Sequence, residues 1–220
     1  ENGTILWSWH IWVVDYVPTS ENQTYYSGAV MMDRNLGATV PTPDYNNLDT
    51  SWKPAAGAIY QWGRKDPIMH ETVSVQHSWF YSVEESVQNP ALFAAGGDYW
   101  LNPMDEYLWR PDSKTMYDPC PAGWRVSPKS AWEGISYALS YPYGATLNIN
   151  EGDSIWVGYG PYMHSGGDYF ENNGNGYTWT SEYNHGSIHG WTVRYWDSYW
   201  DFCCDMNATD AYPVRCMKEN

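Results

Sequence analysis

The 220-residue sequence is poor in basic residues, and this shortage excludes several classes of partner. Eleven Lys and Arg residues stand against 26 Asp and Glu residues, so the formal net charge is −15 at pH 7. An acidic surface repels phosphate, which argues against nucleic-acid binding and against anionic membrane surfaces. The sequence also lacks an apolar run long enough for a membrane span, and it does not begin with the basic and apolar regions of a signal peptide. We therefore expect no membrane insertion of this domain, and we interpret the chain as a mature piece excised from a longer surface protein.

Cysteines are few, and their spacing excludes a zinc cluster because no C-x-x-C pair occurs among the four. Cys120 and Cys216 each stand beside a proline-containing segment, and we predict a disulfide between them. The adjacent Cys203 and Cys204 could bridge each other only with strain, so they are free or paired elsewhere. A disulfide indicates an oxidising location, which is the periplasm, the cell surface or the extracellular space.

Signatures of catalysis are also missing. The sequence has no G-x-S-x-G elbow, no H-E-x-x-H pair and no phosphate-binding glycine loop. The cysteine pair lacks a neighbouring base, which weakens the hypothesis of a cysteine-oxidising enzyme. We predict that the protein is not an enzyme and has no cofactor or metal. Calcium in the oxygen-rich segments 102–106 and 150–153 remains an alternative, as in a calcium-dependent glycan-binding lectin.

Aromatic residues that carry a polar group are abundant instead, with 15 Trp and 20 Tyr against only 4 Phe. Such rings suit surfaces that contact proteins or carbohydrates, although they would equally fill gaps in a loop-rich core. They are densest in residues 179–216, which read WTSEYNHGSIHGWTVRYWDSYWDFCCDMNATDAYPVRC. Alternation there places Trp191 and Val193 in the core. From Asp197 onward the order is indifferent to burial, so we predict that Tyr195 to Asn207 lie on the surface.

Apolar periodicity and turn residues predict the elements of the rest of the chain. A first strand over 5–16 would bury Ile5, Trp7, Trp9, Ile11 and Val13. Further strands are expected at 29–32, 154–159, 177–181 paired with 190–196, and 211–217. Helices are expected at 54–63 and 128–140, with a shorter one near 86–95 inside a long loop insertion at 68–116. A strand at each end predicts that the two termini lie close together.

Five segments then suggest a family: WSWHIWVVDY, MMDRNLGA, GAIYQWGRKDP, YDPCPAGWRV and YPVRCMKEN. Together they resemble a domain of Bacteroidales surface proteins, described as the Fibrobacter major paralogous type and often carried at the C-terminus of fimbrial tip proteins. The resemblance runs from about Gly3 to the end. It implies a single domain over 1–220 of the α+β class with a C-type-lectin-like fold. That fold has two small antiparallel sheets, two flanking helices at 57–64 and 127–140, and long loops that carry the binding site. Cys120 and Cys216 match the family positions, which supports their pairing.

Domains of the fold implied by the resemblance also serve as targets of diversity-generating retroelements, which randomise adenines at AAC or AAT codons. Only residues whose codons end in C or T can result. Such codons fit fifteen residues of a predicted variable, ligand-binding face, namely Tyr183, Asn184, His185, Ser187, His189, Tyr195, Asp197, Ser198, Tyr199, Asp201, Phe202, Cys203, Cys204, Asp205 and Asn207. They do not fit Trp191, Trp196, Trp200 or Met206, which would be scaffold under that face. An ordinary aromatic and polar loop would have a similar composition.

We therefore expect an extracellular adhesin or receptor-binding domain at a fimbrial tip or on the outer membrane. Its rings would anchor a surface protein or a glycan, and Asp, Ser, His and Asn would adapt their hydrogen bonds to it. The alternative is a structural pilus or envelope subunit that has no free ligand and uses its aromatic residues to contact other pilus subunits.

Overall fold

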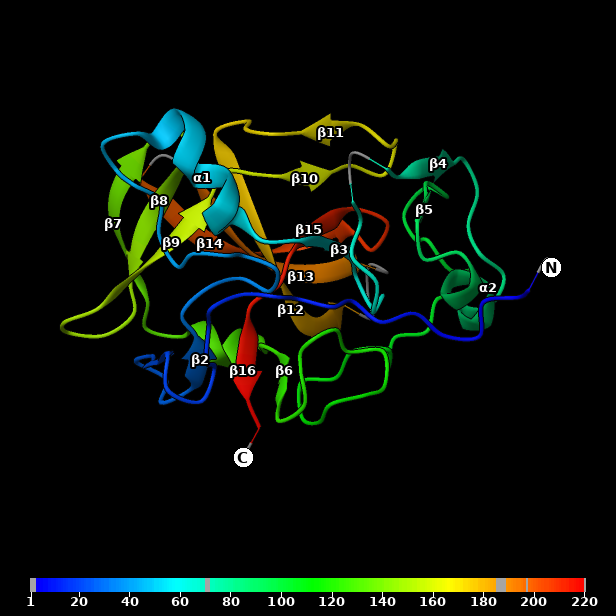
Figure 1. Cartoon of the computed structure of the whole chain (residues 1–220), viewed down its shortest axis with the longest axis horizontal. Coiled ribbons are helices and arrows are strands. Elements are labelled where there is room, and N and C mark those ends of the chain that lie inside the picture. Colours follow the sequence, from blue (N-terminus) through cyan, green and yellow to red (C-terminus); the bar gives the residue numbers. More distant parts are fainter. Residues whose placement is uncertain (1–2, 70–71, 185–188, 197, 220) are drawn as a thin grey trace.

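A computed structural model of the chain describes residues 3–69, 72–184, 189–196 and 198–219, and it consists mostly of short strands (Figure 1). Strands make up 35% of the chain and helices 9%. The helical elements are α1 Leu48–Ala56, α2 Val83–Gln88 and the 3₁₀ turn η1 Lys129–Trp132. The strands are β1 Asn22–Thr24, β2 Val30–Met32, β3 Ile59–Gln61, β4 Ser74–Gln76, β5 Leu92–Ala94, β6 Trp124–Val126, β7 Ser136–Tyr141, β8 Gly144–Asn148, β9 Ser154–Gly158, β10 Tyr162–Met163, β11 Tyr169–Phe170, β12 Asn175–Asn184, β13 His189–Trp196, β14 Tyr199–Asn207, β15 Ala211–Pro213 and β16 Cys216–Lys218.

The predicted α+β class, with its C-type-lectin-like pair of sheets and two flanking helices, is wrong. In the part of the chain that the structure describes, only α1 is a helix of seven or more residues, and the protein is mostly β. The described strands form five sheets, with the orders β1-β2-β16-β6, β11-β10-β15-β3, β12-β13-β14, β7-β8-β9 and the parallel pair β4-β5. Of the helical elements, α1 packs against β9, and the turn η1 packs against β12 and β13.

Neither predicted long helix is present with its expected bounds. Residues 128–140 form η1 and then β7, because Gly134 takes a φ of +83° that ends the helical turn. A Cβ at Gly134 would also stand 2.8 Å from Cβ of Tyr26. Residues 54–63 divide between the end of α1 and β3, and Gly57, with a φ of +86°, separates the two elements. The helix predicted near 86–95 is only partly present, because α2 spans 83–88 and residues 92–94 form strand β5.

The predicted first strand over 5–16 is also wrong, because the described part of that segment has no regular secondary structure. Trp9, Ile11 and Val13, which were expected in the core, are 77%, 80% and 86% exposed. The prediction failed because no described strand pairs with the segment. Without a sheet, the alternating apolar side chains have no common buried face. Side chains hold it instead, such as Trp7, whose ring lies 4.5 Å from Nζ of Lys65.

The remaining strand predictions are confirmed in outline. Strands β2, β9 and the antiparallel pair β12 and β13 lie where the alternation placed them. The expected last strand is divided into β15 and β16, which belong to different sheets. Strand β16 pairs with β2 near the beginning of the chain, so the sheet joins early and late segments although the segment before β1 runs away from it (Figure 1).

Large rings fill the core, and their polar atoms are mostly satisfied there. Trp62, Trp132 and Trp179 are fully buried. Their ring N–H groups donate to the Thr180 carbonyl, the Ser127 hydroxyl and the Tyr60 carbonyl, respectively. Much of the Trp and Tyr content therefore serves packing rather than contact with a ligand, as a ring with a polar group needs a partner when it is buried.

Two adjacent residues near the C-terminus bind distant segments together. The predicted disulfide between Cys120 and Cys216 is confirmed, and it closes a separation of 96 residues. Beside it, the Arg215 side chain is 1% exposed. Its guanidinium donates to Oδ1 of Asn35, to the Tyr25 hydroxyl and to the Trp156 carbonyl at 3.0–3.2 Å. One side chain thus joins the loop after β2, the end of β1 and strand β9.

Replacement of this arginine tests its role in the fold. Arg215→Met should lower the free energy of unfolding by about 3 kcal/mol or more, because a buried acceptor that loses its donor costs about 1–3 kcal/mol. Urea unfolding followed by tryptophan fluorescence measures the change. Arg110→Met is the matched control, since this arginine is 46% exposed beside Asp112. The control should change stability by less than about 0.5 kcal/mol, and an equal loss in both variants would contradict the role of Arg215.

Candidate functional site

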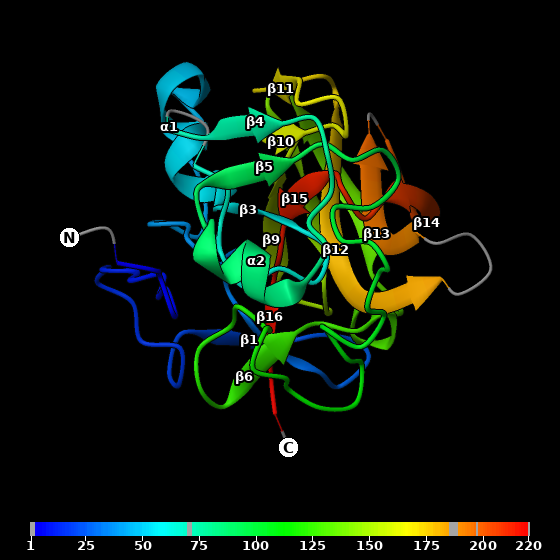
Figure 2. The same cartoon turned by 90° about the vertical axis from the view of Figure 1, so that its right-hand side faces the viewer.

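The region predicted to bind a ligand forms the sheet β12-β13-β14, which stands on one side of the molecule (Figure 2). Strand β14 forms one edge of that sheet. Residues directly opposite each other on antiparallel strands point to the same face. The register pairs Arg194 with Tyr177 and Asp201, and it pairs Trp196 with Asn175 and Tyr199. We call the surface formed by Tyr177, Arg194, Trp196, Tyr199 and Asp201 the Arg194 face.

Charged and aromatic groups on the Arg194 face hold one another in place. The Arg194 guanidinium donates two hydrogen bonds to the Asp201 carboxylate, at 3.1 and 2.8 Å. It also lies 4.5 Å from the centre of the Trp196 ring, and that ring is 4.7 Å from the Tyr199 ring. Tyr199 is 54% exposed, while the Arg194 and Asp201 side chains are 31% and 30% exposed. The face therefore presents a pre-oriented ion pair beside two partly open rings.

The inner part of the same face is closed. Thr192 and Cys203 lie opposite each other on β13 and β14, and both are buried. Cys203 has a free thiol. Tyr177 marks the boundary, because it is half-buried and its ring lies 4.7 Å from that of the fully buried Tyr212. Burial raises the pKa of its hydroxyl to about 12. A ligand can therefore reach only the outer half of this face.

The opposite face of the sheet carries a second, smaller group of partly exposed rings. Trp191, Trp200 and Phe202 are half-buried there. Nζ of Lys129 lies 3.3 Å from the Trp191 ring centre and 5.2 Å from that of Phe202. Phe202 pairs with the fully buried Val193. Because successive residues of a strand point to opposite faces, Phe202 cannot act together with Tyr199 and Asp201 on one flat surface.

The structure separates the predicted ligand-binding residues by burial. Tyr183, Tyr195 and Cys203 are buried, and Tyr195 has no exposed surface, which corrects its expected position on the surface. The Tyr195 ring packs across Gly176, where a Cβ would stand 1.9 Å from a ring carbon. Exposed or half-buried positions are occupied by Asn184, His189, Ser198, Tyr199, Asp201, Phe202 and Asn207. Outside the described residues lie His185, Ser187 and Asp197, and the same holds for the side chains of Cys204 and Asp205.

The scaffold prediction needs a similar correction. Trp191, Trp196 and Trp200 are half-buried rather than hidden beneath the site. Trp196 belongs to the Arg194 face itself and contacts both Arg194 and Tyr199. Arg194 and Tyr177 were not expected in the site. The period-2 alternation of residues 190–196 indicates that Arg194 and Trp196 share a face. Only the pairing with Asp201 and Tyr199 of β14 shows that this face is open to solvent.

The described residues give no support for a metal centre, since no group of three or more His, Cys, Asp or Glu side chains among them is placed to hold an ion. None of the described helices combines the length and apolar character that crossing a membrane requires. Comparison with models of known protein families, with curated protein sequences and with solved structures gives no match.

A titratable pair, His164 and Asp210, lies near the C-terminal end of β14. There the Asn207 side chain donates to the Ser165 hydroxyl. The Asp210 carboxylate accepts from the Ser165 N–H at 2.7 Å and from the Tyr212 hydroxyl at 3.0 Å. Nδ1 of His164 lies 3.7 Å from Oδ1 of Asp210, which is too long for a hydrogen bond and is better described as an ion pair. Contact with Asp210 raises the pKa of His164 above its ordinary value of 6.5, against the lowering effect of partial burial.

This pair predicts how stability depends on pH. Because the folded pKa of His164 is raised, its contribution is complete below about pH 6.5 and is lost as the pH rises through the folded pKa. His164→Gln should therefore destabilise the protein more at pH 5.5 than at pH 8.5. The difference should stay below about 1 kcal/mol, since the pair is partly screened by solvent. Urea unfolding of both proteins at the two pH values measures it, and an equal effect at both would show that His164 contributes only packing.

Proposed function

We propose that this chain is an extracellular ligand-binding domain that recognises a surface protein or a glycan through the Arg194 face. The observation that carries the proposal is the ion pair of Arg194 and Asp201 set beside the partly open rings of Trp196 and Tyr199. Rigid rings bury a large area at little entropic cost, and an oriented ion pair supplies directed hydrogen bonds. The disulfide supports an extracellular location.

We further propose that this domain works at the tip of a fimbria or on the outer membrane, and that a retroelement diversifies the open positions of its C-terminal region. The support from the structure is that Ser198, Tyr199 and Asp201 lie at the open end of the β13 and β14 hairpin. Substitution there leaves the two main core clusters intact, because neither contains these residues. Loss of the partly exposed ion pair of Asp201 costs up to about 1 kcal/mol, and changes at other surface positions usually alter stability by less than about 0.5 kcal/mol.

Ligand binding is tested with a glycan array and a surface-protein pull-down, each carried out on the wild type and on Tyr199→Ala. Binding by the variant should be at least about tenfold weaker, because an exposed ring at the centre of a contact is a common energetic anchor. The melting temperature should remain within about 2 °C of the wild type. Tyr81→Ala is the matched control, since Tyr81 is 71% exposed and stands two residues before α2 in the sequence. Helix α2 lies on the right in Figure 1, away from β14.

Two other results would count against the proposal in different ways. Equal loss of binding in Tyr199→Ala and Tyr81→Ala would place the ligand outside the Arg194 face. Loss of subunit polymerisation in Tyr199→Ala, without any captured ligand, would favour the structural pilus subunit instead.

Diversification is tested by sequencing this gene from related strains. Codons for Ser198, Tyr199 and Asp201 should differ among strains, whereas those for Trp191, Trp196 and Trp200 should not. Tyr195 should also stay constant although its codon could vary, because removal of a fully buried ring costs about 3–5 kcal/mol. Differences scattered evenly along the chain would exclude the retroelement.

A further inference from the structure

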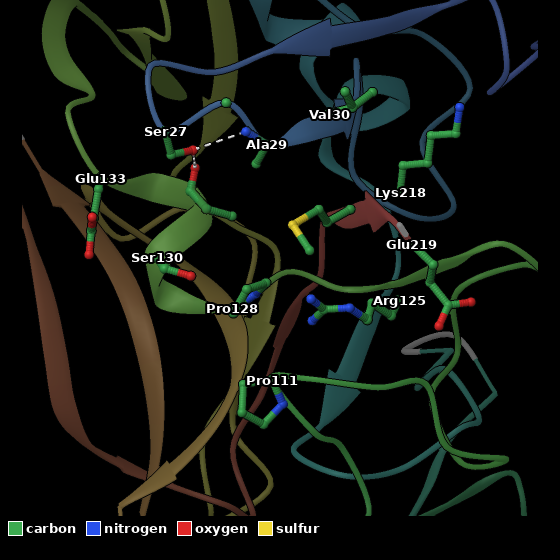
Figure 3. A pocket seen from close by; sticks show the side chains of 13 residues that line it. Ser27, Ala29, Val30, Pro111, Arg125, Pro128, Ser130, Glu133, Lys218 and Glu219 are labelled. Carbon is green, nitrogen blue, oxygen red and sulfur yellow. Dashed lines mark hydrogen bonds between the residues drawn. The ribbon is translucent and has the colours of Figure 1, made fainter.

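A hollow among the described residues shares no lining residue with the Arg194 face. It has a volume of about 770 Å³ and lies between the sheet β1-β2-β16-β6 and the turn η1 (Figure 3). Val30, Met217, Pro111 and Pro128 supply apolar walls. This volume falls within the range of about 300–1,000 Å³ that is usual for small-ligand sites.

A buried cation lines this hollow, and no described residue forms a hydrogen bond or ion pair with its side chain. Arg125 lies in β6 opposite Met217 of β16, and it is only 9% exposed. Its Nη1 atom is shielded from solvent and has no hydrogen-bond partner among the described residues. Figure 3 shows the guanidinium extended from β6 toward Pro128, along the hollow. Arg215, by contrast, is buried to a similar degree and donates to three acceptors.

A buried guanidinium nitrogen without a partner, such as Nη1 of Arg125, is unfavourable, because it has lost hydration and gained no hydrogen bond in return. A ligand that brings an anionic acceptor removes this cost. The planar fork of an arginine fits the two oxygens of a carboxylate. Lys218 on the same rim adds a second positive charge and offsets the carboxylates of Glu133 and Glu219, so the lining is neutral although the chain as a whole carries −15.

The other walls distinguish a peptide from a sugar. Sugars are usually held by stacking on aromatic rings, yet none of the residues that line the hollow is aromatic, although the chain contains 35 Trp and Tyr residues (15 and 20). Val30 and Met217 instead fit an aliphatic or aromatic side chain of the ligand. Glu133 and Glu219, on the walls, can accept hydrogen bonds from backbone N–H groups.

We propose that the hollow beneath η1 binds the C-terminal carboxylate of a peptide whose last side chain is apolar. Arg125 holds the carboxylate, and the apolar walls hold the side chain. This site shares no residue with the Arg194 face, so a substitution can abolish binding at one site and leave binding at the other unchanged.

Equilibrium dialysis with mass spectrometry tests the proposal. The probe is a pool of tetrapeptides that end in valine, leucine or phenylalanine, offered with a free carboxylate or with a C-terminal amide. The wild type should retain the free acids about 10- to 100-fold better than the amides, as hydrogen bonds to a charged group are strong. Arg125→Met should abolish this preference. Ser130→Trp, at an exposed position on the rim, should block retention by filling the hollow.

Melting temperatures separate recognition from folding. Arg125→Met should melt at the wild-type temperature or about 2–4 °C higher, because it removes an unpartnered buried charge. Tyr199→Ala should retain the free acids like the wild type, so failure of this proposal is distinct from failure of the Arg194 face. Equal retention of acids and amides, no retention by the wild type, or a large fall in the melting temperature of Arg125→Met would each overturn the proposal. Retention of digalacturonic acid but not of peptides would assign the site to acidic sugars instead.

Discussion

The guanidinium of Arg215 is the interaction on which the arrangement of this protein most depends. Most strands here have only two to six residues, and such strands have little stability by themselves. A buried charge must find acceptors, and Arg215 finds them on Tyr25, Asn35 and Trp156, which are far apart in the sequence. The next residue, Cys216, adds a covalent connection to Cys120. Together they hold the beginning, middle and end of the chain in one geometry.

This fixed interior explains how a long hairpin can stand out from it. Part of β12 and β13 packs into the core, where the Trp179 ring N–H donates to the Tyr60 carbonyl and the Tyr195 ring packs across Gly176. The outer ends of β13 and β14 carry Trp196, Tyr199 and the ion pair of Arg194 and Asp201. Side chains there contact mainly each other, so they can change without loss of the core. A stable inner half and a replaceable outer half are what a surface for recognition requires.

The two buried arginines differ in a way that has functional meaning. Both lie next to the C-terminal strand β16, and both have lost nearly all contact with water. Arg215 is satisfied within the fold and therefore acts as structure. Arg125 is not satisfied among the described residues, and it lines a hollow of about 770 Å³. Burial alone thus says little about the role of a charged side chain, whereas the account of its hydrogen bonds separates support from recognition.

The sequence by itself determined the disulfide between Cys120 and Cys216, the pairing of β12 with β13, and the richness of the C-terminal region in Tyr and Trp. The strand pairing and the aromatic content are local patterns in the sequence. The disulfide could be predicted because the chain has only four cysteines. It did not determine whether 5–16 or 128–140 would be strand, helix or neither, because alternation and helical spacing acquire meaning only when a partner element is present. Only the tertiary structure decided that Gly134 ends η1 and that Tyr199 is open while Tyr195 is buried. It also decided that Arg215 has partners, whereas Arg125 has none among the residues that the structure describes. Each of these outcomes depends on atoms that are distant in the sequence and meet only in the folded chain.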